Sequence, residues 1–177
     1  MKDKLIAKRY ATAAILNIPE NQYYSVMEDM KFLRKAFAQD EDYIKSINSY
    51  LFPLQNRIKL VKQISAQLNN RVIWENLFVL LVKKHRFTII MEVLNEMENT
   101  VLISKNQVKV SLTIAHEHSE IVLNKISSKI ADIIKKDVVM KVNIDPEIIG
   151  GFIAQTDSLL IDGSIKNGLV KLVSSKK

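Results

Sequence analysis

The spacing of hydrophobic positions changes near residue 105, and this change divides the chain into two parts. Before it, apolar side chains recur at intervals of three or four residues, which is the period of one face of an α-helix. After it, residues 107–114 alternate strictly between apolar and polar side chains, which is the period of a β-strand. The pattern therefore predicts two domains, at residues 1–104 and 105–177.

Residues 1–104 contain six segments with helical periodicity. Pro19 and Pro53 stand where helices are expected to begin, because the first helical turn tolerates a missing N–H, and Asp40 can cap a short third helix. The fifth segment, residues 72–82, leaves little polar surface. A helix of this kind is buried on most sides or keeps one face for a partner helix. The pattern predicts a six-helix bundle.

Residues 105–177 predict a strand, a helix, a strand, a hairpin and a helix in that order. The first strand at 107–114 places its apolar residues on one face, and a second alternating run at 138–144 predicts another strand. Between them, Ser119 can cap a helix. We expect the buried side of this helix to carry Val122, Ile126, Ile130 and Ile133. The predicted fold class is α+β with two domains: an N-terminal six-helix bundle followed by a small C-terminal α/β domain.

Three turn signals punctuate the C-terminal stretch. Asp145-Pro146 ends the second strand, because proline offers no N–H to a ladder. Gly150-Gly151 allows a left-handed backbone or the close approach of another segment. Asp162-Gly163 turns the chain again, and Ser164 can then cap a final helix that begins at Ile165. The run between the glycine pair and Asp162 predicts a β-hairpin.

Composition narrows the kind of protein further. Hydrophobic residues make up 47% of the chain and charged residues 25%, which is typical of a folded protein, and the small number of glycines and prolines favours helix. The absence of cysteine excludes disulfides, thiolate metal sites and cysteine nucleophiles. The longest wholly apolar run, residues 77–82, is far shorter than the ~20 residues that span a bilayer. We therefore expect neither a membrane-spanning segment nor a targeting segment.

The net charge of +7 is spread along the chain and is not gathered in one stripe. A basic protein can bind nucleic acid, so a nucleic-acid-binding adaptor is the alternative function that the charge leaves open. Modules that bind nucleic acid interleave basic and aromatic residues, whereas residues 106–177 contain no arginine and only one aromatic residue, Phe152. The charge by itself favours a soluble basic surface.

Candidate catalytic groups are few, and they form no recognisable set. His116 and His118 would share a face of a strand, which suits two metal ligands, but no third ligand stands at a useful spacing. Gly163 and Gly168 have the separation found in a phosphate-binding loop, but Leu169 replaces the lysine that such a loop needs. We expect no catalytic residue, no cofactor and no metal, and hence a binding or scaffold role in place of an enzymatic one.

Three segments resemble a known family. The most specific is Asp145-Pro-x-Ile-Ile-Gly-Gly-Phe152, followed by Asp157, by Ile161-Asp-Gly-Ser-Ile-Lys166 and by Leu169-x-x-Leu172. The others are Arg9-Tyr-Ala-x-Ala-Ala14 and Asn76-Leu-x-x-Leu-Leu-x-x-x-His-Arg-Phe87. The sequence is similar to the delta subunits of bacterial F-type ATP synthase, relatives of the mitochondrial oligomycin-sensitivity-conferring protein. It departs from the family pattern at His85, where a small residue is usual, and Gly168 weakens the final helix.

The resemblance implies a non-catalytic stator subunit, which links the catalytic head to the peripheral stalk and resists rotor torque during proton-driven ATP synthesis. It implies that residues 1–104 bind N-terminal helices of alpha subunits and that residues 105–177 meet the C-terminal end of the b subunit, with one copy of the chain per complex. It also implies no cofactor, no nucleic acid, and a peripheral place on the cytoplasmic side of the bacterial cytoplasmic membrane.

Two sets of residues are the candidate sites under this resemblance. The first is a groove between the first and fifth helices, in which small side chains face aliphatic ones. We expect it to be formed by Tyr10, Ala13, Ala14, Leu77, Leu80 and Leu81. The second is the C-terminal family motif. Its members singled out here are Gly150, Gly151, Asp162, Gly163, Ser164 and Lys166.

Overall fold

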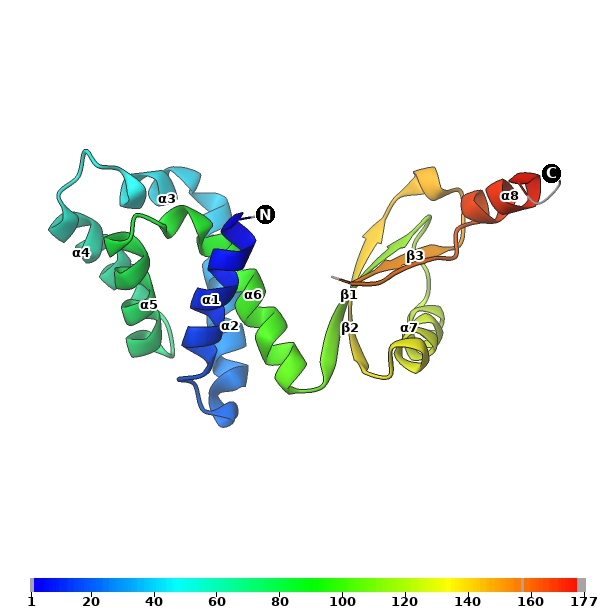
Figure 1. Cartoon of the computed structure of the whole chain (residues 1–177), viewed down its shortest axis with the longest axis horizontal. Helices are drawn as coiled ribbons and strands as arrows, with labels where there is room; N and C mark the ends of the chain where they lie inside the picture. The colour runs from blue at the N-terminus through cyan, green and yellow to red at the C-terminus, as the bar shows by residue number, and fades with distance from the viewer. Residues whose placement is uncertain (1, 157, 175–177) are drawn as a thin grey trace. The chain divides into compact units, whose positions relative to one another are not determined.

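The computed structural model describes residues 2–156 and 158–174, and the chain divides into two compact units. The first runs from Met1 to Val101 and the second from Leu102 to Lys177. The first unit is helical, and the second holds a sheet together with helices (Figure 1). The prediction of a mixed helical and sheet protein is therefore confirmed. The division between the units falls inside a helix, slightly before residue 104.

Six α-helices build the first part of the described chain, and two short 3₁₀-helices precede the second and sixth. The helices are α1 Lys2–Ile15, η1 Glu20–Gln22, α2 Tyr23–Gln39, α3 Glu41–Asn48, α4 Leu54–Ser65, α5 Arg71–Lys83, η2 Phe87–Ile89 and α6 Ile90–Ser104. Pro53 directly precedes α4, and Oδ1 of Asp40 accepts a hydrogen bond of 2.9 Å from the N–H of Tyr43, which caps α3. After Pro19 the chain first makes the 3₁₀ turn η1, so α2 begins later than the proline alone indicated.

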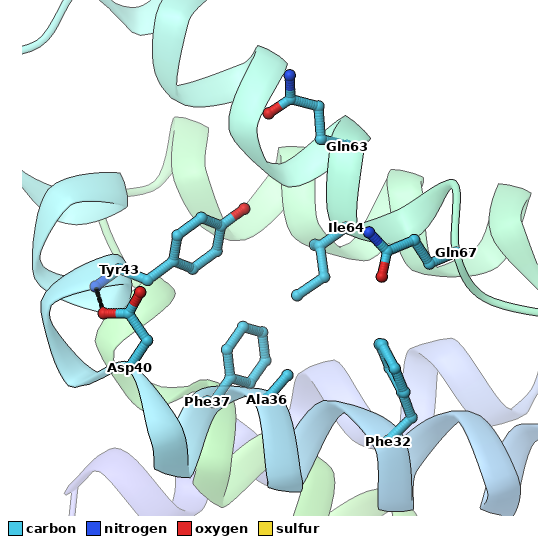
Figure 2. A pocket seen from close by; sticks show the side chains of 8 residues that line it. All are labelled: Phe32, Ala36, Phe37, Asp40, Tyr43, Gln63, Ile64 and Gln67. Atoms are coloured by element: carbon cyan, nitrogen blue, oxygen red, sulfur yellow. Dashed lines mark hydrogen bonds between the residues drawn. The ribbon is translucent and has the colours of Figure 1, made fainter.

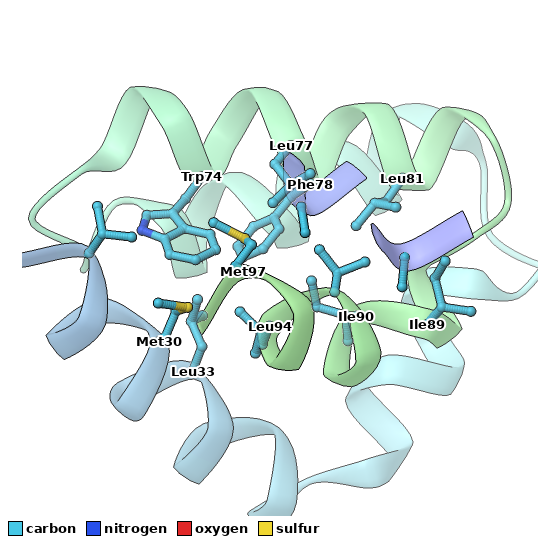
Figure 3. Close-up of a cluster of buried hydrophobic side chains, with 14 of the residues drawn as sticks. Met30, Leu33, Trp74, Leu77, Phe78, Leu81, Ile89, Ile90, Leu94 and Met97 are labelled. Carbon is cyan, nitrogen blue, oxygen red and sulfur yellow. The ribbon is translucent and has the colours of Figure 1, made fainter. Parts of the chain in front are cut away.

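Large side chains of α2, α5 and α6 form the core of the first unit (Figure 3). Phe78 of α5 is fully buried and meets the rings of Phe37 and Phe87 edge-on, with ring centroids 6.4 and 5.6 Å away. Trp74, one turn earlier on α5, is also fully buried. Helices of this length are marginal by themselves, so the packing of these apolar faces stabilises the bundle.

One buried carboxylate joins α2 to the start of α5. Asp29 is 2% exposed, and its oxygens accept hydrogen bonds of 2.9–3.0 Å from the backbone N–H and side-chain amide of both Asn69 and Asn70. They accept a further one of 2.9 Å from Nε1 of Trp74. Asn70 precedes α5 without capping it through its own side chain. Asp29 thus anchors the connection between α4 and α5 from another helix.

From β1 onward, the described residues of the second unit form a four-stranded sheet, two α-helices and one short 3₁₀-helix. Its elements are β1 Gln107–Ile114, α7 Glu120–Ile134, β2 Asp137–Ile144, η3 Pro146–Ile148, β3 Phe152–Gln155, β4 Leu160–Asp162 and α8 Ile165–Ser174. The strand order is β2-β1-β3-β4, in which β1 pairs with β2 in parallel and with β3 antiparallel, and β3 and β4 pair antiparallel. Parallel neighbours need a crossover connection, which α7 supplies. The central strand β1 buries Val110, Leu112 and Ile114.

The buried side of α7 differs from the predicted one at two positions. Val122 and Ile133 are exposed, by 38% and 62%, and Leu123 and Ile134 pack against the core of the sheet in their place. Apolar residues cover much of the circumference of α7, so two overlapping stripes satisfy the helical period and contact with the sheet selects one of them. Ser119 precedes α7 as predicted, but its side chain makes no capping hydrogen bond.

Candidate partner-binding sites

The α1 residues expected to line a groove lie toward the surface of the first unit. Tyr10 and Ala14 are half-buried and Ala13 is exposed. The small residues of α1 that enter the core are instead Ala7 and Ala11, both fully buried. Because they precede Ile15 at four-residue spacing, they form the buried face of α1. The later alanines are thereby left for contacts outside the core.

On α5 the predicted leucines divide between core and surface. Leu77 and Leu81 are buried, whereas Leu80 is 43% exposed. Val72, near the start of the helix, is 70% exposed, so α5 is not buried on every side. The helix contacts α1 and keeps an apolar side chain at its surface in Leu80.

Arg86 connects the end of α5 to α1, a role that the sequence does not reveal. Its Nη1 donates a hydrogen bond of 3.2 Å to Oη of Tyr10. In the sequence, Arg86 stands out only as part of the segment from Asn76 to Phe87 that resembles the family. The contact spans 76 positions of the chain, so only the fold brings the two side chains together.

The side of α5 that faces α4 carries charged residues, in contrast to the surface at Leu80. The carboxylate of Glu75 lies 2.9 Å from Nζ of Lys62 on α4 and 3.6 Å from Nε of Arg71. The hydrogen bond from Lys62 lowers the pKa of the Glu75 carboxyl, and the charge of Arg71 adds to this effect. The acid therefore remains ionised at neutral pH, and α5 presents charge toward α4 and an apolar side chain at Leu80.

A pocket of about 320 Å³ opens between α2, α3 and α4 (Figure 2). It is lined by Phe32, Ala36, Phe37, Asp40, Tyr43, Gln63, Ile64 and Gln67. Oη of Tyr43 donates a hydrogen bond of 2.8 Å to the carbonyl of Leu60, and burial, with the nearby charge of Asp40, raises the pKa of Tyr43. The carboxylate of Asp40 is engaged in capping α3. The lining therefore offers no nucleophile together with a base.

The glycines of the C-terminal motif allow two segments to approach closely. Gly151 has a φ of +80°, and a Cβ added there would lie 2.3 Å from the carbonyl oxygen of Gly163. The carbonyl of Gly150 accepts a hydrogen bond of 3.0 Å from the N–H of Ile165. These contacts join the segment before β3 to the start of α8.

The polar residues of the same motif form the turn into α8. Oδ1 of Asp162 accepts a hydrogen bond of 2.9 Å from the N–H of Ser164, and Oγ of Ser164 accepts one of 3.2 Å from the N–H of Asn167. The predicted cap at Ser164 is therefore confirmed. Lys166 is exposed on α8. Asp157, which belongs to the resemblance, lies outside the described residues.

The described residues show no arrangement suited to metal binding or to a membrane span. His116 and His118 are exposed in the segment after β1, which ends at Ile114. They therefore do not share a strand face, contrary to the expectation from the sequence. No group of three or more histidine, aspartate or glutamate side chains is placed to hold a metal ion in residues 2–156 and 158–174. No helix in the same ranges is long and apolar enough to cross a membrane.

Comparison with known proteins places both units in one family. The family model described as ATP synthase delta (OSCP) subunit matches residues 6–175. The ATP synthase subunit delta of Desulfotalea psychrophila is 29% identical, with 100% of this chain and 98% of the relative covered. That of Carboxydothermus hydrogenoformans is also 29% identical, with 99% and 98% covered.

A solved structure shares the fold. A chain of the Toxoplasma gondii mitochondrial ATP synthase hexamer superposes with a TM-score of 0.76 at 15% identity, and 96% of each chain is covered. Neither these matches nor the described geometry supports the nucleic-acid-binding alternative.

Proposed function

Because the chain belongs to the ATP synthase delta (OSCP) subunit family, we propose that it works as a non-catalytic stator subunit of an F-type ATP synthase. It links the catalytic head to the peripheral stalk, so that rotor torque drives ATP synthesis and does not spin the head. The observation that carries this function is the family match from residue 6 to residue 175, which includes both units. The place of the subunit is peripheral, on the cytoplasmic side of the bacterial cytoplasmic membrane.

The first unit binds the N-terminal helices of alpha subunits along α1 and α5. Tyr10, Ala13 and Ala14 on α1 and Leu80 on α5 support this surface, because all four reach the outside of the unit. Small side chains let a guest helix approach closely, and an exposed leucine offers it an apolar anchor. Leu77 and Leu81 act from beneath, where they hold α5 against the core.

The second unit meets the C-terminal end of the b subunit. The residues of the C-terminal motif form hydrogen bonds that position β3 and α8. The contact surface for the b subunit therefore lies on these elements and not on the motif residues themselves. Ile165 and Leu169 on α8 are 52% and 55% exposed, which suits an apolar partner. One copy of the chain serves each complex.

The alpha-binding surface is tested by placing charge on it. Ala14→Arg and Leu80→Asp should each weaken binding of a synthetic N-terminal peptide of the cognate alpha subunit about ten-fold or more, because a charge would be buried against an apolar helix face. Isothermal titration measures the affinity. Leu80 is substantially exposed, so its variant should keep the wild-type melting temperature even if Ala14→Arg does not.

Ala38→Arg is the matched control, because Ala38 is an exposed alanine on α2, a helix that contributes no residue to the proposed surface. It should bind the peptide with wild-type affinity. Equal affinity of Leu80→Asp and wild type would reject this surface as the alpha-binding site.

A further inference from the structure

Arg57, in the first turn of α4, is buried with few of its hydrogen-bond donors satisfied. It is 4% exposed, and its Nε has no hydrogen-bond partner within the described residues. Its Nη1 lies 3.3 Å from Nδ1 of His85, and no carboxylate of the described chain pairs with it. A guanidinium has five donors and is charged at all physiological pH values, so burial without an anion is costly. Arg57 is therefore prepared for an anionic partner.

His85 contributes an acceptor to this arrangement. Arginine can only donate, so Nδ1 of His85 is the acceptor in this contact. His85 itself adopts a φ of 51°, in the left-handed region that few non-glycine residues occupy. The turn between α5 and η2 thus directs the imidazole onto the buried guanidinium and leaves the positive charge without a counter-ion.

The chain beside Arg57 exposes an unusual run of apolar side chains. Tyr50 stacks on the ring of His85 with centroids 4.3 Å apart, yet it is 78% exposed. Leu51 and Phe52, which follow it between α3 and α4, are 91% and 46% exposed. Neighbouring exposed apolar residues of this size mark an interaction surface more often than a solvated loop. The cationic side chains of Lys83, Lys84 and Arg86 are exposed next to His85.

We propose that Arg57, His85 and the loop residues Tyr50, Leu51 and Phe52 form a docking site for an acidic amphipathic segment of a protein partner. A carboxylate of the segment pairs with the guanidinium of Arg57, while its apolar side chains cover Leu51 and Phe52. The ring of Tyr50 is largely exposed, so it can move away from His85 and contact the segment without disturbing the core. The surrounding lysines favour an acidic segment over a basic one.

This inference rests on the proposed function in one respect: the stator role is the reason for placing the protein partner on the catalytic head. Charge complementarity decides the chemistry of the segment: an uncompensated buried cation selects a carboxylate, and the apolar loop selects a segment with an aliphatic or aromatic face. A small anion such as inorganic phosphate shares the first requirement but not the second. Experiments can therefore distinguish the carboxylate of a protein segment from a small anion.

The test replaces Arg57 with methionine, which keeps much of the side-chain volume and removes the charge. Arg57→Met should melt at the wild-type temperature or above it in the isolated chain, because an uncompensated buried charge disappears. Its affinity for the purified catalytic head of the cognate complex should fall about ten-fold or more. Lys59→Met is the matched control, since Lys59 is an exposed cation on the same helix, and it should change neither quantity.

A second variant tests the apolar half of the site. Phe52→Ser, in the exposed loop, should weaken head binding several-fold without lowering the melting temperature. Wild-type affinity of either Arg57→Met or Phe52→Ser overturns the proposal. If Arg57→Met melts lower and binds more weakly, Phe52→Ser decides: weaker binding at an unchanged melting temperature supports the docking site, and unchanged binding rejects it.

Titrations of the isolated chain separate this proposal from the proposed function. If the wild-type chain does not bind the head, the stator role fails, but sodium acetate should still shift the Arg57 Nε–H signal in an NMR spectrum at constant ionic strength. Absence of that shift rejects the carboxylate site. Saturable binding of inorganic phosphate, together with head binding that is insensitive to Arg57→Met and Phe52→Ser, would identify a small-anion site and also overturn the proposal.

Discussion

At the scale of single residues, long-range polar contacts decide how the helices of the first unit meet. Asp29 lies on α2 but satisfies donors on the connection between α4 and α5 and on α5 itself, 40 to 45 positions later. The local sequence around Asp29 indicates an ordinary polar position of an amphipathic helix. Its role comes from the donors that the fold gathers around it, because a buried carboxylate needs several hydrogen bonds to remain stable.

Replacing Asp29 should therefore be among the more damaging single changes in the first unit. Asp29→Ala should lower the free energy of unfolding by about 2–4 kcal/mol, because Nε1 of the buried Trp74 and amide groups of the connection lose their acceptor. Urea denaturation followed by tryptophan fluorescence measures this change. Asp42→Ala is the control, since that carboxylate is 87% exposed, and it should cost less than about 0.5 kcal/mol. Equal losses in the two variants would contradict the anchoring role of Asp29.

At the scale of elements, the turns around the C-terminal hairpin show which glycines the fold requires. Gly151 has a positive φ and no room for a Cβ. At Gly168, inside α8, a Cβ would meet no described atom within 4 Å apart from those of the chain neighbours and of the helix's own backbone. The same residue type thus serves a necessary close approach in one place and weakens a helix in the other. Sequence alone marks both glycines, but only the surroundings separate them.

The two glycines should respond to alanine in opposite directions. Gly168→Ala should stabilise α8 by up to about 1 kcal/mol, because alanine loses less backbone freedom in a helix. Gly151→Ala should destabilise the hairpin by more than about 1 kcal/mol, because the left-handed backbone and the carbonyl of Gly163 both oppose a side chain. Amide hydrogen exchange across β3 and α8 reports both effects. Faster exchange in α8 of Gly168→Ala would contradict the expected stabilisation of that helix. Unchanged exchange in β3 of Gly151→Ala would contradict the expected destabilisation of the hairpin.

At the scale of the whole molecule, each unit carries its own hydrophobic core. The core of the first unit lies within residues 6–101, and the core around β1 lies within residues 108–161. A stator subunit that holds a head at one end and a stalk at the other needs two binding units that each keep their shape under load. Self-contained cores supply this property.

The first unit should therefore fold when separated from the second. A fragment of residues 1–105, which keeps all of α6, should show a helical circular dichroism spectrum and a cooperative thermal transition. It should bind the alpha peptide with nearly the affinity of the full chain. It should not restore ATP synthesis to complexes that lack this subunit, because it lacks the unit that we propose binds the stalk. A fragment without a cooperative transition would show that the first core depends on the second unit.

The local order of the chain follows from the sequence. The change of hydrophobic period near residue 105 separates helices from strands, and Asp40, Pro53 and Ser164 mark element starts through short-range backbone chemistry. These signals are reliable because they act over a few residues. The motif beyond Asp145 identified the family, since several spaced residues had to coincide.

Only the tertiary structure decided which of the available residues make the contacts. In α1 it buried Ala7 and Ala11 and left Ala13 at the surface, and in α7 it selected Leu123 in place of Val122. Where apolar residues cover more than one face, the helical period permits several buried stripes, and the neighbouring element chooses among them. The contact between Arg57 and His85 also joins residues that are far apart in the chain. Its interaction energy arises only once folding has brought the two side chains together, so the local sequence does not reveal it.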